Sequence, residues 1–281
     1  MEPLKKNLIK DYDLNFPYYW KKVFSEYKND KFSERVWFAG PTSYVFSLSG
    51  VKFAVDLQVR RDSDFEKILP TLLDDTSALT FVLITHQHDD HMCIPLMRAL
   101  KDSPIVWYIP EGTHEHLIEK TEIPSEKIVR VKNGDCFKIG DVIIKAFDST
   151  HERPEEEPIF QQLGYEVITP NGKLLFPADV RNYDLNLYPS FSDIDVCFSH
   201  LWAGDDTVNA ENYMPLLKEF ADFNSHFGAK KYFICHLYEI AREFRHMWRY
   251  THAAEAMELF MERIPEAEIM IPHLGSSYEL F

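Results

Sequence analysis

Short apolar runs alternate with helix-like segments over most of the chain. From Arg35 onward, RVWFAG, TSYVFSLSG and VKFAVDL are rich in β-branched and aromatic residues and predict strands. The same pattern predicts strands at TFVLIT, IVWYI, DVIIKAF, GYEVITPNGKLLF, DVCFS, KKYFIC and EIMIP. Ser49-Gly50 and the Pro170-Asn171-Gly172 triplet predict hairpin turns, because these residue types accept the backbone angles of tight turns.

Helical patterns fill the segments between these runs. FEKILPTLLDD, PLMRALKDS, ENYMPLLKEFADF and THAAEAMELFMERI have apolar residues at helical spacing, and Pro95 suits a first helical position. The aromatic and lysine-rich N-terminal region predicts an amphipathic helix. No internal repeat or low-complexity linker divides the rest. We therefore predict one α/β domain over residues 35–281, with a helical extension over residues 1–34 packed on it.

Seven of the apolar runs end in a residue that can bind a metal ion. These residues are Asp56, His86, His151, Asp179, His200, His236 and His273. Strands of a layered sheet present their ends along common edges, and the loops at those edges carry functional sites. The pattern therefore predicts that these side chains gather in one cluster.

The densest part of this pattern is HQHDDH, residues 86–91. It fits HxHxDH through His86, His88, Asp90 and His91. Neutral imidazoles and carboxylates are ligands of zinc and neighbouring divalent ions. Their alternate spacing lets the two pairs face different ways, so one short loop could supply ligands to two ions.

An HxHxDH motif after a buried strand, followed by single His, Asp and His residues at later strand ends, resembles the metallo-beta-lactamase superfamily. The resemblance covers about residues 35–281 and implies a four-layer αββα sandwich with metals at one edge of its two sheets. It implies a first metal ion held by His86, His88 and His151 and a second held by Asp90, His91 and His236. Asp179 would bridge the two ions. Asp56 would not bind metal but would orient a ligand histidine through a hydrogen bond.

Other histidines offer alternatives to this ligand set. His273 also ends an apolar run and could replace His236 as the last ligand, although the final histidine of the family precedes a helix and one more strand, as His236 does. His114 and His116 form a second HxH. They lack a preceding strand and a following Asp-His pair, so we expect a solvated helix start there.

The resemblance also implies the chemistry. Two divalent ions, Zn²⁺ first and Mn²⁺ or Fe²⁺ as alternatives, can lower the pKa of a shared water, and the bridging hydroxide would attack a carbonyl or phosphoryl centre. Asp90 and His200 are the predicted catalytic residues. The redox di-iron branch has a carboxylate where this chain has His88, which favours hydrolysis over oxygen chemistry.

Within the superfamily the sequence looks most like the broad hydrolase group that includes ascorbate-6-phosphate lactonase and, second, resembles the tRNA 3′-processing endonucleases. The endonucleases carry a His-Glu dipeptide whose histidine donates a proton. Here Leu201 follows His200, so only the histidine of the dipeptide is present, and the sequence does not decide whether His200 is a proton donor. Trp202 is predicted to line the pocket or to belong to the core.

Two arginines are candidates for substrate binding. Arg153 and Arg181 each follow a predicted metal ligand by two residues, so they could hold a phosphate or carboxylate. Alternatively they pair with nearby acids such as Glu155 or Asp184.

Composition narrows the possible partners. The 281 residues include 45 acidic and 30 basic side chains, and the net charge of −15 without a basic block argues against long nucleic acids. The four cysteines form no CxxC pair and are predicted to be buried thiols. No apolar segment approaches membrane-spanning or secretory length, which predicts a cytoplasmic protein without a membrane partner.

We therefore predict a dinuclear metallohydrolase for a small, anionic molecule that is a lactone, an ester or a phosphodiester. The alternatives are an RNA-processing nuclease or other phosphodiesterase of the same fold, and a non-catalytic metal-binding sensor. The sequence does not identify the substrate, the native metal or the oligomeric state, and it is compatible with a homo-oligomer.

Overall fold

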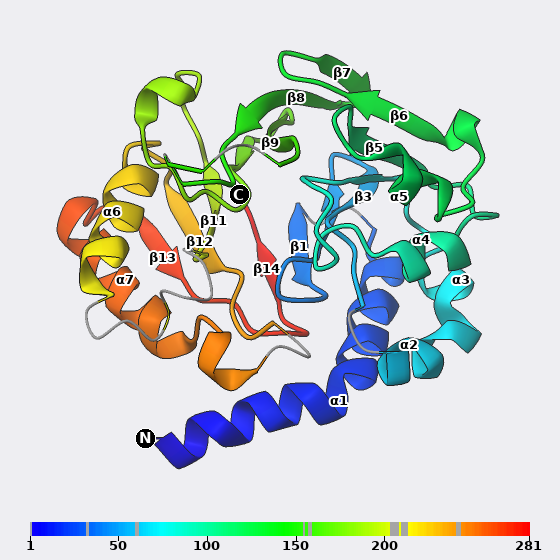
Figure 1. The fold of residues 1–281 in the computed structure, drawn as a ribbon, viewed down its shortest axis with the longest axis horizontal. Helices are drawn as coiled ribbons and strands as arrows, with labels where there is room; N and C mark the ends of the chain where they lie inside the picture. The colour runs from blue at the N-terminus through cyan, green and yellow to red at the C-terminus, as the bar shows by residue number, and fades with distance from the viewer. Residues whose placement is uncertain are drawn as a thin grey trace.

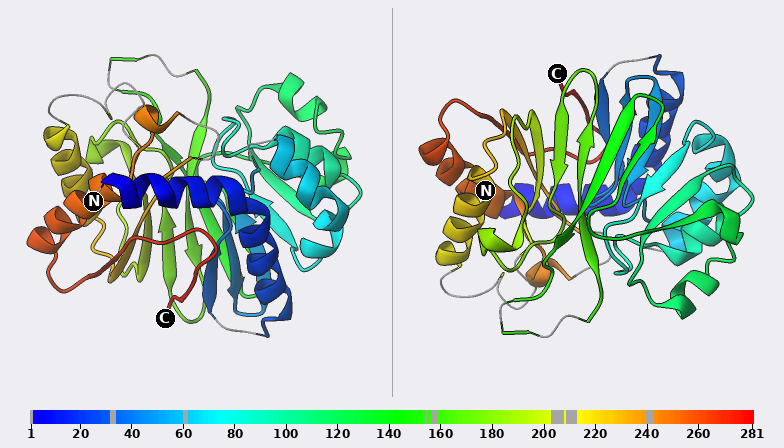
Figure 2. Two further views of the ribbon diagram at one scale, coloured as in Figure 1. Left: turned by 90° about the horizontal axis from the view of Figure 1, so that it is seen from below. Right: turned by 90° about the horizontal axis from the view of Figure 1, so that it is seen from above.

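The computed structural model describes residues 2–31, 34–59, 62–153, 155–156, 159–202, 208, 213–239 and 243–281. Two seven-stranded sheets pack face to face, and helices cover the outer face of each (Figures 1 and 2). The αββα architecture implied by the sequence is therefore confirmed.

The first sheet has the strand order β14-β1-β2-β3-β4-β5-β6. Its strands are β14 (Ser277–Glu279), β1 (Arg35–Phe38), β2 (Tyr44–Leu48), β3 (Val51–Val55), β4 (Phe81–Leu83), β5 (Val106–Pro110) and β6 (Ile128–Val131). The predicted hairpin joins β2 to β3. Ser49 and Gly50 both have positive φ, at 47° and 77°, which suits the right-handed twist of the two strands.

The second sheet has the order β13-β12-β11-β10-β9-β8-β7. Its strands are β13 (Glu268–Met270), β12 (Lys231–Cys235), β11 (Val196–His200), β10 (Lys173–Phe176), β9 (Gln162–Ile168), β8 (Val142–Ser149) and β7 (Cys136–Ile139). Strands β10 to β13 run parallel, and His200 at the end of β11 pairs with Cys235 at the end of β12. The carboxyl ends of these two strands therefore open on the same edge.

The helices form the two outer layers. Those beside the first sheet are α1 (Glu2–Asn29), α2 (Asp62–Ile68), η1 (Leu69–Thr71), α3 (Leu72–Asp75), α4 (Ile94–Ala99), α5 (Glu115–Glu119) and η2 (Ser125–Lys127). The remaining ones are η3 (Leu185–Leu187), α6 (Met214–Ser225), η4 (Phe244–His246) and α7 (Tyr250–Arg263), of which α6 and α7 cover the second sheet. Helix α1 runs past both halves of the molecule (Figure 2, left).

Three apolar clusters separate the four layers. Trp20 and Phe24 of α1 pack against Trp37 of the first sheet, and Phe220 of α6 packs against Tyr232 of the second. The cluster between the sheets is largely aromatic. Its stacked pairs include Phe53–Phe81 and Phe176–Phe198, with ring centroids 4.8 and 4.5 Å apart. This packing fixes one sheet against the other, so the strand ends of both meet at one edge.

The structure corrects several sequence-based expectations. The predicted helix FEKILPTLLDD is interrupted by the 3₁₀ turn η1, which contains Pro70. Strands β6, β7 and β14 were not predicted. The prediction that every cysteine is buried is wrong, because Cys136 lies exposed on the edge strand β7.

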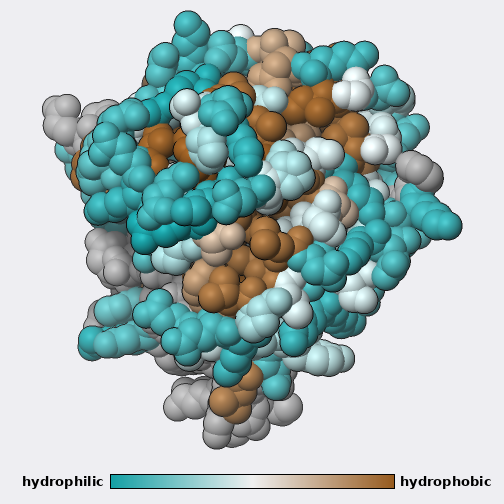
Figure 3. All heavy atoms as spheres, turned by 90° about the vertical axis from the view of Figure 1, so that its right-hand side faces the viewer, coloured by the Kyte–Doolittle hydropathy of each residue, from teal (hydrophilic) through white to brown (hydrophobic). Residues whose placement is uncertain are grey.

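The surface is mostly hydrophilic, in keeping with the large negative charge. On the face that carries the helices beside the first sheet, apolar side chains gather in the middle and polar ones surround them (Figure 3). Among the described residues, none of the helices has the length and hydropathy that a membrane span requires.

Candidate metal centre

Strand ends from both sheets converge on one site, and the backbone there is strained. Asp56 follows β3, Ala178 precedes Asp179 after β10, and His236 follows β12. All of Asp56, Ala178 and His236 have positive φ, between 50° and 63°. Non-glycine residues in this region cost on the order of 1–3 kcal/mol each, and such residues concentrate at functional sites. These backbone conformations turn the side chains toward the common edge.

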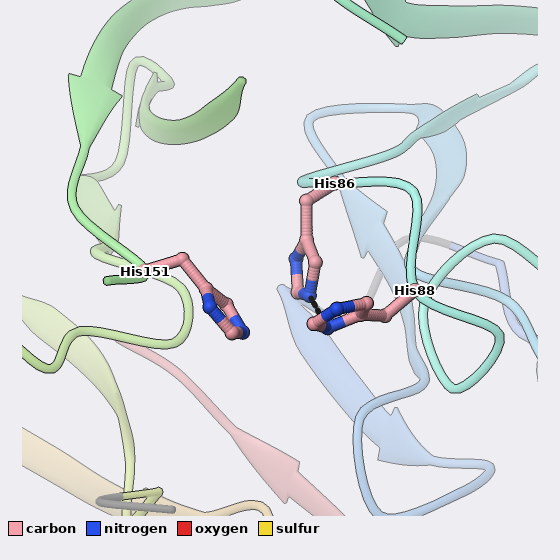
Figure 4. A group of neighbouring side chains, drawn as sticks. All are labelled: His86, His88 and His151. Atoms are coloured by element: carbon pink, nitrogen blue, oxygen red, sulfur yellow. Dashed lines mark hydrogen bonds between the residues drawn. The ribbon is translucent and has the colours of Figure 1, made fainter. Parts of the chain in front are cut away.

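Three histidines form one part of the site, which we call the histidine group: His86, His88 and His151. Their candidate ligand nitrogens all lie within 4.8 Å of one another. His86 and His88 come from the loop after β4, and His151 approaches them from the segment after β8 (Figure 4). His86 and His151 are buried, whereas His88 is exposed.

The hydrogen bonds around His86 fix its tautomer. The Thr85 hydroxyl donates its single proton to Asp56 Oδ2 at 2.7 Å, so it can only accept from His86 Nδ1 at 3.1 Å. His86 Nε2 is then unprotonated, and it lies 3.1 Å from His88 Nδ1.

The nitrogen atoms of the histidine group fit a cation. His151 Nε2 is buried and has no hydrogen-bond partner in the described part of the chain. Converging imidazole nitrogens repel one another unless a proton or a cation lies among them.

The second part of the site, which we call the mixed group, consists of Asp90, His91 and His236. Their ligand atoms also lie within 4.8 Å of one another, and all three residues are buried. His236 Nε2 lies 3.6 Å from Asp90 Oδ2. His91 Nδ1 donates to Asp56 Oδ2 at 2.8 Å, which turns Nε2 toward the group. Asp56 is itself held by the backbone N–H of Thr85 at 2.8 Å, so its predicted place behind a ligand histidine matches its contacts.

Asp179 lies between the two groups. Its Oδ2 is 3.1 Å from His91 Nε2 and 3.2 Å from His236 Nε2, and it also forms a candidate ligand set with His86 and His91. The structure thus brings together all seven predicted ligands: His86, His88, Asp90, His91, His151, Asp179 and His236.

The two groups differ in charge. Burial lowers the pKa of His86 well below the ordinary value and that of His151 to about 4, and partial burial lowers the pKa of the more exposed His88. Burial also opposes the charging of His236, but Asp179 and Asp90 outweigh it and raise the pKa of His236 to about 10. In return, despite burial, His236 and His91 hold the pKa of the Asp179 carboxyl well below its usual range.

His200 has contacts on both ring nitrogens. Its Nδ1 lies 2.7 Å from Asp179 Oδ1 and its Nε2 lies 2.9 Å from the Tyr44 hydroxyl. Both partners are buried, as is His200 itself. The predicted proton donor therefore faces protein atoms on both sides.

The predicted substrate-binding residues have partners of their own. Arg181 Nη1 lies 3.4 Å from Glu156 Oε2, and that carboxylate also accepts from the backbone N–H of Arg153 at 3.0 Å. An acid thus pairs with Arg181, as the alternative expectation held, but it is Glu156 rather than Glu155 or Asp184. Trp202 is buried and stacks on His236, with ring centroids 5.0 Å apart.

The other candidate histidines lie apart from the ligand sets. His273 Nδ1 lies 2.6 Å from the Tyr250 hydroxyl and 3.1 Å from the Tyr12 hydroxyl, whereas His236 faces Asp179 and Asp90. His114 and His116 are exposed at the start of α5, as expected of a solvated helix start.

Two residues that border the site, Phe160 and Tyr44, were not predicted from the sequence. The ring of Phe160 lies over the histidine group, with centroids 5.6 Å from His86, 4.6 Å from His88 and 5.2 Å from His151. Tyr44 contacts His200. Tyr44 lies in a predicted strand and Phe160 in a polar loop, and no residue pattern in the sequence distinguishes them.

Comparison with known proteins identifies the family. A sequence model described as "Beta-lactamase superfamily domain" matches residues 57–237, more than half of the chain. A curated relative, "UPF0173 metal-dependent hydrolase" of Pyrobaculum neutrophilum, is 28% identical over 168 residues, which cover 57% of this chain and 68% of the relative.

Solved structures share the fold at low identity. The metallo-beta-lactamase fold protein YhfI from Bacillus subtilis has a TM-score of 0.60 and 15% identity, covering 87% of this chain and 98% of that one. CmlA, a diiron beta-hydroxylase from Streptomyces venezuelae, has a TM-score of 0.62 and 13% identity, covering 89% of this chain and 55% of that longer one. The chain therefore belongs to the metallo-beta-lactamase superfamily and is a hydrolase of that superfamily, with a cluster of histidine and aspartate side chains suited to metal binding.

Proposed function

We propose that the protein is a dinuclear metallohydrolase that acts on a small molecule. The observation that carries this proposal is the convergence of seven ligand side chains into two groups that meet at Asp179. The histidine group and Asp179 would hold one divalent ion, and the mixed group and Asp179 would hold the other. Nitrogen and carboxylate ligands suit Zn²⁺ first, and they also suit Mn²⁺ or Fe²⁺.

When bound, a pair of divalent ions supplies a water of lowered pKa and a Lewis acid that polarises a carbonyl or phosphoryl oxygen. The protein's own residues prepare the ligands for these ions. Asp56 accepts a hydrogen bond from the Nδ1–H of His91, and the Thr85 hydroxyl accepts one from the Nδ1–H of His86. Each histidine therefore directs its Nε2 toward the cluster, where His86 Nε2 is already unprotonated and His91 Nε2 would lose its proton when an ion binds.

The surroundings of the site suggest how a substrate is bound. The ring of Phe160 packs against all three members of the histidine group and borders the space where a substrate would bind. Arg181 and Arg153, which share Glu156 as a partner, are the candidates for binding an anionic group of the substrate. Lactones and esters offer an electrophilic carbonyl carbon and phosphodiesters an electrophilic phosphorus, and an anionic substituent of the substrate would bind these arginines.

The test combines metal content with turnover. Protein purified without added metal is analysed for its elements, stripped with a chelator, and assayed against lactones, esters and phosphodiesters after Zn²⁺, Mn²⁺ or Fe²⁺ is restored. We expect about two ions per chain at saturation and hydrolysis that requires them. Two bound ions without hydrolysis of any compound would favour the metal-binding sensor. Full turnover in metal-stripped protein would contradict the proposal.

A further inference from the structure

His200 contacts Asp179 Oδ1 and Tyr44 contacts His200 in turn, and the proposed hydrolysis gives neither of these buried side chains a role. His200 Nδ1 lies 2.7 Å from Asp179 Oδ1, and the Tyr44 hydroxyl lies 2.9 Å from His200 Nε2. Asp179 is 1% exposed, His200 4% and Tyr44 0%. Tyr44 begins β2 of the first sheet and His200 ends β11 of the second, so this chain of hydrogen bonds joins the two sheets.

The positions of the protons follow from the partners. An ionised carboxylate only accepts hydrogen bonds, so His200 Nδ1 carries a proton and donates it to Asp179 Oδ1. The Tyr44 hydroxyl has one proton and three possible acceptors: His200 Nε2 at 2.9 Å, the Pro41 carbonyl at 3.2 Å and the Cys235 thiol. Donation to Nε2, which is nearer than the carbonyl, leaves His200 neutral, with one proton received and one donated.

The two carboxylate oxygens of Asp179 have different partners. Oδ1 is bound to His200, while Oδ2 lies near His91 and His236. The terminal torsion of an aspartate is broad when nothing restrains it, so the bond to Oδ1 decides which oxygen faces the cluster. Asp56 plays the same part for His91.

We propose that Tyr44 and His200 are positioning residues that fix the orientation of Asp179 toward the metal cluster, and that His200 is not the proton donor of the reaction. This inference rests on the proposed function, because it gives the two residues a task only where Asp179 is a metal ligand. A proton donor must reach the leaving group, whereas both nitrogens of His200 are bonded to buried protein atoms.

Tyr44 offers a clean test. Its ring packs edge-on against Phe38 at 5.3 Å and tilted against Phe198 at 5.4 Å, and Tyr44→Phe keeps these contacts while removing the hydroxyl. Tyr232→Phe is the matched control. The Tyr232 hydroxyl is equally buried and bonded, to Asn224 O at 3.1 Å and the Ala229 N–H at 2.9 Å, but it lies in the apolar cluster beneath α6 and α7.

The experiment titrates the metal-stripped full-length chain with Zn²⁺ against a coloured chelator. Loss of such an outer contact lowers metal affinity by about 10- to 100-fold, so we expect about tenfold weaker binding of one ion in Tyr44→Phe and about 100-fold in His200→Ala. His200→Asn, which keeps a donor near the Nδ1 position, should lie between the wild type and His200→Ala. Excess Zn²⁺ should restore turnover in all three variants, and Tyr232→Phe should match the wild type throughout.

Three results would overturn the inference. One is equal Zn²⁺ affinity in the wild type and Tyr44→Phe, and another is an equal loss in Tyr232→Phe. The third is a His200→Ala variant with unchanged Zn²⁺ affinity and a loss of turnover that excess Zn²⁺ does not restore, because that is the behaviour of a proton donor. A wild-type protein that binds no pair of ions would instead overturn the proposed function, so the two failures are distinguishable.

Discussion

The histidine group and the mixed group share one loop and one aspartate, yet their surroundings are opposite. His86 and His151 are held neutral by burial, whereas His91 and His236 lie among the carboxylates of Asp90 and Asp179 and have raised pKa values. HQHDDH supplies both groups because its alternate positions face different ways. The neutral group is ready to bind a cation at neutral pH, while the mixed group must first lose protons.

The outer contacts follow the same division. In the mixed group His91 rests on Asp56, and His236 Nδ1 lies 3.8 Å from the buried Glu239. Asp179, which both groups share, rests on His200. The histidine group is bounded chiefly by the ring of Phe160 and by Thr85. The charged mixed group therefore has more polar partners than the neutral histidine group, because a buried charge requires partners.

The largest effect is expected from removal of Asp179, the residue that both groups share. We expect Asp179→Ala to lose the pair of ions and to lower kcat/KM by about 1,000-fold or more, since metal-assisted catalysis contributes several kcal/mol and each tenfold costs 1.36 kcal/mol. Elemental analysis and the substrate panel measure both effects. If Asp179→Ala kept both ions at full affinity, Asp179 would not be the shared ligand.

A smaller change separates the mixed group from the rest. His236→Ala should lose one ion, keep the other and lower turnover by about 100-fold or more. His273→Ala is the matched control, because His273 also ends an apolar run but contacts Tyr12 and Tyr250. It should keep two ions. The reverse result would make His273 the last ligand.

Residue type and spacing in the sequence were sufficient to predict the candidate metal ligands of both groups. HQHDDH and the single His and Asp residues at strand ends carry ligand chemistry in their side chains, so their convergence followed from the strand pattern. Tyr44 and Phe160 were missed because ordinary apolar positions acquire their roles only through tertiary packing. The positive φ of His236 and Ala178 was missed for the same reason, since the surrounding fold imposes it.

The charge difference should appear in the pH dependence of the metal-free protein. For His151, the folded pKa of about 4 lies below the ordinary 6.5, so the unfolded chain binds more protons between these values and stability is lost as pH falls from 6.5 to about 4. For His236, the folded pKa of about 10 lies above 6.5, so its contribution is fully present below 6.5 and is lost as pH rises through about 10. Each effect is on the order of a few kcal/mol, at about 1.4 kcal/mol per pKa unit.

Urea denaturation of chelator-treated protein from pH 4 to pH 10 measures both effects. His151→Ala should flatten the loss of stability at acid pH, and His236→Ala should flatten the loss at alkaline pH. Identical profiles for these two variants would show that the groups do not differ in charge.

The smallest expected effect concerns the aromatic boundary of the histidine group. Phe160→Leu keeps an apolar side chain but loses three ring contacts, and an aromatic pair contributes about 0.5–1.5 kcal/mol. We therefore expect a loss of about 3- to 10-fold in the Zn²⁺ affinity of one ion, together with a higher KM for substrates. Phe191→Leu is the control, since Phe191 is also half-buried and has a ring contact, at 5.0 Å with Phe147, away from these histidines. Equal Zn²⁺ affinity and KM in the two variants would mean that Phe160 shields the site no more than any other surface aromatic residue does. The neutral state of the histidine group would then result only from its burial within the fold.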